Sequence, residues 1–200
     1  MRLGLFGGSF DPIHRGHVEP VLEAAERLGL DRVVYLPTGR PPHKPDRKLA
    51  PALPRYAMTD IALLEHQDLW VSAFELSEER PSYTIDTILH FRAKHPAAEI
   101  FLLVGADSYA ELRLWHRWEA ILDNATLVVL DRPPIKANAA KIEGSSAAPV
   151  TDHRVVLAGN SPRDVSSTEI RALLARRERP PSSWMSSAVV DFALKYRLYR

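Results

Sequence analysis

Residues 3–18 read LGLFGGSFDPIHRGHV, and this stretch decides how the chain begins to fold. Leu3, Leu5 and Phe6 make a short apolar run, which predicts a buried strand. Apolar residues then recur at helical spacing and predict a helix: Val18, Val21, Leu22, Ala25 and Leu28. The segment 7–17 therefore lies at a strand-to-helix junction, where backbone N–H groups and the helix dipole attract anions.

The residues at this junction suit the binding of phosphates. Gly7 and Gly8 let the backbone approach a ligand closely or adopt a positive φ. His14 and His17 fall on one side of the chain if the first helical turn starts there. Two other interpretations stay open: a His-x-x-His metal site, although no third ligand lies nearby and the chain has no cysteine, and a plain glycine-rich turn with surface histidines.

Strand and helix patterns alternate along the rest of the chain. Apolar runs predict strands at 32–37, 69–74, 99–104, 125–130 and 154–157. Helical spacing predicts helices at 56–65 and 84–94, and a final amphipathic helix after Pro180-Pro181. The alternation predicts an α/β fold with a doubly wound, mostly parallel sheet and helices on both faces. We expect one domain over residues 1–200, with a C-terminal helical segment from about residue 167.

Two segments depart from this alternation. Residues 38–54 are rich in proline and basic side chains, which predicts a long loop near the site. Residues 133–149 are small, polar and alanine-rich, and we interpret them as a variable surface segment.

The composition excludes several classes of protein. Apolar residues make up 46% and charged residues 26% of the chain, and the net charge is only +1, so no global field attracts nucleic acid or an anionic membrane. The absence of cysteine excludes disulfides and thiolate catalysis. Because the chain shows neither a signal-peptide pattern nor a membrane-spanning apolar run, we expect a cytoplasmic protein. The sequence leaves the oligomeric state open, a homo-oligomer included.

A second phosphate-binding candidate lies near the end of the chain. Residues 164–171 read DVSSTEIR, and Ser166 and Glu169 have the spacing of a capping box at a helix start. Hydroxyls that merely cap the helix are the alternative. Three hydroxyls in a row exceed the need of one cap, however, and the planar guanidinium of Arg171 suits phosphate oxygens. Two helix N-termini that face one another could hold a triphosphate.

With both motifs the chain resembles the nucleotidyltransferase superfamily marked by H-x-G-H and a late S-S-T-x-I-R. Further blocks resemble those of the bacterial nicotinate-nucleotide adenylyltransferases, and they occur in that family's order. The blocks are Leu36-Pro37-Thr38, Pro41-Pro42-His43-Lys44, Pro81-Ser82-Tyr83-Thr84-Ile85-Asp86-Thr87, and Gly105-Ala106-Asp107 with Leu112 and Trp115. The resemblance implies a Rossmann-like nucleotidyltransferase fold.

It also implies a reaction in which ATP and nicotinate mononucleotide give deamido-NAD and pyrophosphate with Mg²⁺. The mononucleotide phosphate attacks the α-phosphorus in line, and since it is already anionic no strong general base is required. Catalysis then comes from positioning and charge neutralisation. The resemblance implies no metal ligands from the protein, because phosphates and water hold the Mg²⁺.

The resemblance assigns roles to matching positions. His14, His17 and Arg171 are the implied catalytic residues, with His17 closest to the transition state. The implied ATP-binding residues are Gly7, Gly8, Ser9 and Phe10 at the first motif, Gly105 and Asp107 at the ribose, and Ser167 and Thr168 at the β and γ phosphates. The implied acceptor-binding residues are His43, Lys44 and Arg132 at the mononucleotide phosphate, Tyr83 and Thr84 at the nicotinate carboxylate, and Trp115 stacked on the ring.

Three alternatives to this function stay open. One is an adenylyltransferase that prefers nicotinamide mononucleotide or another phosphate acceptor. Another is a nucleotide sensor without turnover, and a third is a nucleic-acid-binding protein. The near-neutral charge and the lack of a basic–aromatic stripe argue against the third.

Overall fold

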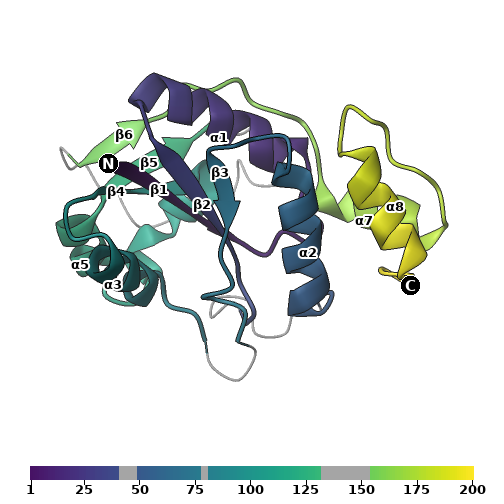
Figure 1. Cartoon of the computed structure of the whole chain (residues 1–200), viewed down its shortest axis with the longest axis horizontal. Helices are drawn as coiled ribbons and strands as arrows, with labels where there is room; N and C mark the ends of the chain where they lie inside the picture. The colour runs from purple at the N-terminus through teal and green to yellow at the C-terminus, as the bar shows by residue number, and fades with distance from the viewer. Residues whose placement is uncertain (41–48, 78–80, 132–153) are drawn as a thin grey trace.

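Six strands form one sheet in which every neighbouring pair runs parallel (Figure 1). This computed structural model describes residues 1–40, 49–77, 81–131 and 154–200. The strands are β1 (Arg2–Gly8), β2 (Arg32–Pro37), β3 (Leu69–Val71), β4 (Glu99–Gly105), β5 (Thr126–Leu130) and β6 (Val155–Leu157). Their spatial order is β3-β2-β1-β4-β5-β6, which is the order of a doubly wound dinucleotide-binding sheet. The predicted fold class is confirmed.

Helices cover both faces of the sheet (Figure 1). One face carries α1 (Arg15–Leu28), α2 (Ala52–Leu63), α7 (Ser167–Ala175) and α8 (Ser187–Lys195). The other carries α3 (Thr84–Lys94), α4 (Ala106–Ala110), the 3₁₀ turn η1 (Leu112–Leu114) and α5 (Trp118–Asn124). Figure 1 shows α7 and α8 beyond α2, at the end of the molecule that holds the C-terminus.

The two apolar cores follow from the alternation of side chains along the strands. In β4, Phe101 and Leu103 pack under α1 and α2, whereas Ile100, Leu102 and Val104 pack under α3 and α5. All five side chains are buried, so the strand is apolar without interruption. The continuous apolar runs that predicted parallel strands thus belong to a sheet covered on both faces.

Element boundaries differ from the prediction in three places. Helix α2 begins at Ala52, four residues before the predicted start, although Pro54 lies in its first turn. Proline is tolerated there because the first N–H groups of a helix have no intrahelical acceptor. The strand predicted over 69–74 ends at Val71. The short elements between residues 106 and 124 were not predicted, because their one or two turns are too short to show a period.

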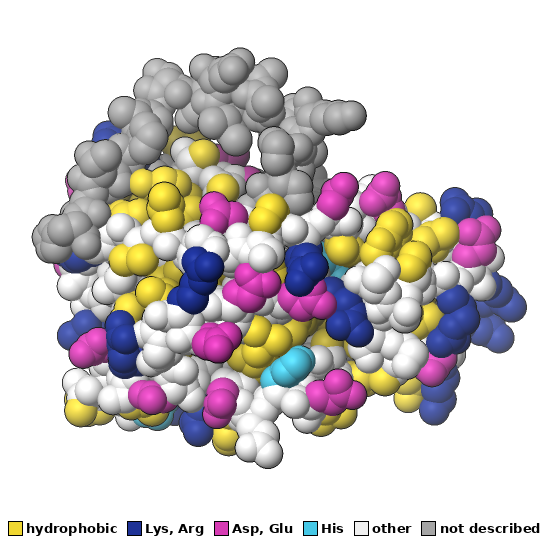
Figure 2. All heavy atoms as spheres, turned by 90° about the horizontal axis from the view of Figure 1, so that it is seen from above, with side chains coloured by type: hydrophobic (Ala, Val, Ile, Leu, Met, Phe, Trp, Pro, Cys, Tyr) yellow, Lys and Arg dark blue, Asp and Glu magenta, His cyan; other side chains and the backbone are white. Residues whose placement is uncertain are grey.

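The surface carries both signs of charge. Figure 2 shows acidic and basic side chains interspersed on one face, with Lys and Arg gathered over the end of the molecule formed by α7 and α8. There Arg176 pairs with Glu178 and Arg179 pairs with Asp191, all exposed. Among the described residues, no helix combines the length and the apolar character needed to span a bilayer.

Candidate nucleotide-binding site

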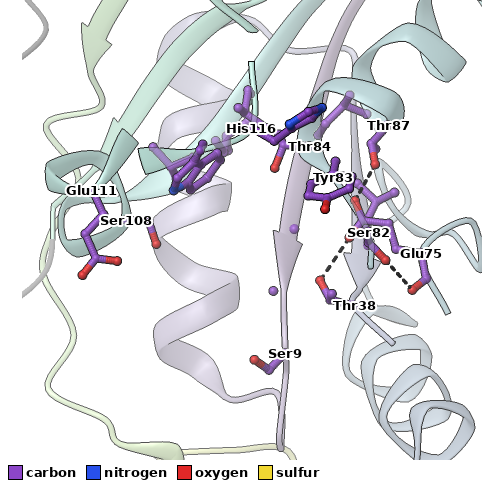
Figure 3. A pocket seen from close by; sticks show the side chains of 18 residues that line it. Ser9, Thr38, Glu75, Ser82, Tyr83, Thr84, Thr87, Ser108, Glu111 and His116 are labelled. Atoms are coloured by element: carbon purple, nitrogen blue, oxygen red, sulfur yellow. Dashed lines mark hydrogen bonds between the residues drawn. The ribbon is translucent and has the colours of Figure 1, made fainter. Parts of the chain in front are cut away.

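A pocket of about 180 Å³ opens at the carboxyl ends of β1, β2 and β4. It lies where the strand order reverses between β1 and β4, the usual ligand position in open parallel sheets. One wall is the loop after β1, the second is the stretch that enters α3, and the third is the segment after β4 (Figure 3). The lining residues from these walls are Gly7, Gly8, Ser9, Tyr83, Thr84, Ser108, Glu111, Trp115 and His116.

The two glycines of the first motif matter because they lack a side chain, since neither has a positive φ. A Cβ on Gly7 would meet no atom within 4 Å, so its missing side chain leaves the pocket open. A Cβ on Gly8 would lie 2.9 Å from the ring of Phe10. The positive φ of this turn falls on Phe10 itself, at 43°, an uncommon conformation for a bulky residue. Burial of the Phe10 ring against Phe6 and Tyr35 holds it there.

The two histidines of the motif lie on one side of the chain, as the sequence predicted, and their rings are in contact. Their ring centroids are 3.7 Å apart, and His14 is the N-cap of α1. The His14 backbone N–H donates to Nδ1 of His17 at 3.3 Å. An Nδ1 that accepts leaves the proton of a neutral imidazole on Nε2, so His17 presents an N–H donor at its far edge. The ring of Phe10 packs edge to face against that of His17, with centroids 5.3 Å apart.

The second motif lies beside the first. Arg171 Nη1 donates to the Asp11 carbonyl at 2.7 Å, and Ser167 Oγ donates to the Pro12 carbonyl at 3.2 Å. Helix α7 is therefore hydrogen-bonded directly to the loop that leads into α1, which brings Arg171 to the motif that holds His14 and His17. Ser166 caps α7 as predicted, but it accepts from the N–H of Thr168, one residue earlier than the capping-box spacing predicts.

The hydroxyls of α7 differ in what they can offer a phosphate. Ser167 already donates its proton to the Pro12 carbonyl, so its backbone N–H is the group left to point at an anion. Thr168 Oγ1 instead accepts from Arg171 Nη2 at 3.1 Å, which leaves its own proton to donate. These contacts of Arg171 use two of the five guanidinium N–H groups. Thr168 and Arg171 are thus the better placed phosphate donors.

The acceptor candidates that the structure describes share one pocket. Tyr83 is the N-cap of α3 and Thr84 is its first residue, and both line the pocket, so the start of this helix forms part of the cavity wall. Trp115 lines the pocket from the segment after β4, and the ring of His116 lies 4.5 Å from that of Tyr83.

The two candidates for the ATP ribose follow the same strand: Gly105 ends β4 and Asp107 lies in α4, next to Ser108 of the lining. The candidates His43, Lys44 and Arg132 lie outside the described residues.

The donor set favours anions over metal ions. In the described part of the chain, no group of three or more His, Cys, Asp or Glu side chains is arranged to hold a metal ion. What converges instead are N–H groups, hydroxyls and a guanidinium. The metal interpretation of His14 and His17 therefore finds no support among these residues.

Comparison with known proteins assigns the family. Residues 5–173 match the family model described as "Cytidylyltransferase-like". A Thermus thermophilus protein named "Probable nicotinate-nucleotide adenylyltransferase" is 41% identical over 200 residues, all of both chains. A Pseudomonas paraeruginosa protein of the same name is 38% identical over 210 residues, covering 100% of this chain and 97% of its own. The chain belongs to the nicotinate-nucleotide adenylyltransferase family.

The fold of this adenylyltransferase family member also matches a solved structure. The structure titled "Plasmodium falciparum nicotinic acid mononucleotide adenylyltransferase complexed with NaAD" superposes with a TM-score of 0.76, at 20% sequence identity, over 99% of this chain and 97% of that one. The matched family region begins within β1 and ends within α7, so it contains both candidate phosphate-binding motifs.

A buried arginine that sequence reasoning missed holds this family's first motif in place. Arg55 of α2 is fully buried, and its guanidinium donates to the carbonyls of Ser9 at 2.6 Å and Ala50 at 2.7 Å. Ser9 lines the pocket and Arg55 does not, so Arg55 holds this part of the pocket wall from outside the cavity. One arginine inside a helix pattern gave no sign of this role, because its partners are backbone carbonyls and the one in the first motif lies 46 residues away in the sequence.

Glu75 is the other functional candidate that the sequence did not reveal. Its carboxylate is buried and accepts from Thr38 Oγ1 at 3.0 Å and from Thr87 Oγ1 at 2.6 Å (Figure 3). Burial raises the pKa of this carboxyl from its ordinary value of 4.5, and the two hydroxyl donors offset only part of that rise.

Glu75→Gln should therefore raise Tm at neutral pH. A raised folded-state pKa means that the folded protein binds the Glu75 proton more tightly than the unfolded chain does. Stability is then greatest below the unfolded pKa and falls as pH rises through the folded pKa. Glutamine carries no charge and avoids this loss. The Gln variant should therefore have the higher Tm at pH values above the folded-state pKa of Glu75, and the difference in Tm should vanish at pH values below the unfolded-state pKa. Thermal melts from acidic to neutral pH, with the exposed Glu65→Gln as control, measure the effect; parallel curves for wild type and Glu75→Gln would contradict it.

Proposed function

We propose that the protein transfers the adenylyl group of ATP to nicotinate mononucleotide, forming deamido-NAD and pyrophosphate. The observation that carries the proposal is the direct joining of the two phosphate-binding helix starts through Arg171 and Asp11, beside a pocket whose far wall is the start of α3. The relatives' names support this reaction. The chain acts here as a single nucleotidyltransferase domain, since α7 and α8 share one apolar core with α1 and α2.

In the proposed reaction the triphosphate lies over the starts of α1 and α7. His17 donates through Nε2–H and Thr168 and Arg171 donate from α7, which neutralises charge on the transferring and leaving phosphates. The phosphate of the mononucleotide attacks the α-phosphorus in line as the α–β bridging bond breaks, and pyrophosphate leaves with the electron pair. Mg²⁺, held by phosphate oxygens and water, adds positive charge to the triphosphate when bound.

The start of α3 supports nicotinate as the acceptor. The Asp86 N–H already donates to the Tyr83 carbonyl at 3.0 Å, so the donors that this helix start can offer are the N–H groups of Thr84 and Ile85. They lie at the positive end of the helix dipole, which favours a carboxylate over a neutral amide. Trp115 lines the same pocket and offers a flat surface for the pyridine ring.

A comparison of the two mononucleotides tests this assignment. We expect kcat/KM for nicotinate mononucleotide to exceed that for nicotinamide mononucleotide by at least about 10-fold. A neutral amide would leave N–H donors arranged for a carboxylate without a matching acceptor. Pyrophosphate release with ATP and Mg²⁺ measures both rates. Equal values would remove the nicotinate assignment, and no release from folded protein with either acceptor would favour a nucleotide sensor instead.

A further inference from the structure

Glu75 connects the residues that follow β2 to the start of α3. Beyond its two hydroxyl contacts, its backbone carbonyl accepts from the Gly39 N–H at 2.6 Å and from Ser82 Oγ at 3.2 Å. Thr38 and Gly39 follow β2, while Ser82 and Thr87 flank the start of α3. The residue therefore links the end of β2 to the start of α3 through four hydrogen bonds. Figure 3 shows the three that involve Thr38, Ser82 and Thr87.

The contact between these segments is also sterically tight. A Cβ on Gly39 would lie 2.4 Å from the carbonyl oxygen of Ser77 and 2.5 Å from that of Leu76. Only glycine permits this approach, because both neighbours are backbone atoms. The chain after β2 and the bend around Glu75 are thus held together by packing as well as by hydrogen bonds.

The connection continues to the phosphate-binding loop. The Thr38 N–H donates to the Gly8 carbonyl at 2.9 Å, and Gly8 lines the same pocket as Thr38, Glu75 and Thr87. A path of direct contacts therefore leads from the end of β1, through Thr38 and Glu75, to the helix that begins at Thr84.

The carboxylate of Glu75 is poorly suited to chemistry of its own. Both oxygens are engaged by hydroxyls, and Thr38 and Thr87 are themselves buried. Within the described residues, Glu75 forms no ion pair with a Lys or Arg side chain. Burying a charge supported only by hydroxyls is unfavourable, so the group calls for an explanation other than stability.

We propose that Glu75 is a positioning residue for the acceptor nucleotide: it fixes the start of α3 relative to the phosphate-binding loop and so sets where the acceptor's ring lies. The inference rests on the proposed function, since it assumes that the carboxylate on the acceptor's ring binds at Tyr83 and Thr84. Because displacements of about 1 Å can cost a reaction 10²-fold, the distance between these two walls matters directly.

Steady-state kinetics with each substrate varied in turn test the proposal. For Glu75→Ala we expect KM for nicotinate mononucleotide to rise by about 10-fold or more, with KM for ATP changed by less than about 3-fold. Glu75→Gln should recover most of the acceptor KM, because its carbonyl accepts from Thr87 and its amide donates to Thr38. Thr87→Val is nearly isosteric and should give an acceptor KM between those of the wild type and Glu75→Ala. It replaces Glu75→Ala as the test if the alanine variant does not fold.

The matched control is Glu65→Ala, an exposed acidic residue after α2. It should leave both KM values unchanged. Equal rises in both KM values, or a Gln variant as impaired as the Ala variant, would overturn the positioning role. If wild-type protein turns over neither mononucleotide, the proposed function fails; if it turns over nicotinate mononucleotide and Glu75→Ala keeps a normal acceptor KM, only this inference fails.

Discussion

Replacing His17 by alanine should lower kcat by about 10²–10³-fold, equivalent to about 2.7–4 kcal/mol of transition-state stabilisation. The Nδ1 of His17 accepts from the His14 backbone N–H, so a neutral ring carries its proton on Nε2, and in the proposed reaction this N–H donates to the phosphates. That donor matters most when charge moves onto the leaving pyrophosphate, so the loss should appear in kcat more than in either KM.

His17→Gln and His66→Ala make the test specific. A glutamine amide can replace the Nε2–H donor, so His17→Gln should recover part of the lost rate. His66, after α2, lies in neither motif, and His66→Ala should behave as wild type. If His17→Ala folds with an unchanged Tm and keeps near-normal turnover, His17 has no role in the transition state.

Replacing Gly7 by valine should abolish most activity while the fold survives. Gly7 lies in β1 without a positive φ, and an added Cβ would meet no neighbour, so a β-branched residue fits the strand. Its side chain would occupy the pocket wall where the ligand is proposed to lie. We expect kcat/KM to fall by on the order of 10²-fold, with Gly7→Ala between wild type and Gly7→Val.

Gly4 of the same strand is the control, because a side chain there would enter the packed core and not the pocket. A Cβ there would lie 3.0 Å from Val33 Cγ2 and 3.1 Å from Leu103 Cδ1, so Gly4→Val should lower Tm through overpacking. Thermal melts and kcat/KM measured on both variants separate the two effects. A Gly7→Val protein with full activity, or one that unfolds as Gly4→Val does, would contradict the assignment of Gly7 to the ligand space.

Local patterns carried much of the fold. The strand predicted over 32–37 and the helix predicted over 84–94 match β2 and α3 at both ends. The sequence of β2 is a continuous apolar run, and α3 is long enough to show the helical period. The helix starts at His14 and Ser166 could likewise be predicted from the sequence, because a helix start depends on residues close together in the chain.

Short or irregular elements were beyond such reasoning. The turns from Ala106 to Asn124 contain too few residues to show amphipathic spacing. The start of α2 was missed because Pro51 and Pro54 suggest a loop, whereas proline is compatible with a first helical turn. The early end of β3 reflects its place at the sheet edge, next to β2 alone.

The sequence by itself determined the parallel sheet, the two phosphate-binding helix starts and the family resemblance, since each depends on residues close together in the chain. Only the tertiary structure decided how these parts meet. Arg171 reaches Asp11 across 160 residues, and Glu75 reaches Thr38 across 37. Such partners are set by how the strands are ordered and how the helices pack over them, and no local pattern encodes that order. The positions of Arg55 and Glu75 behind the site therefore became visible only in three dimensions.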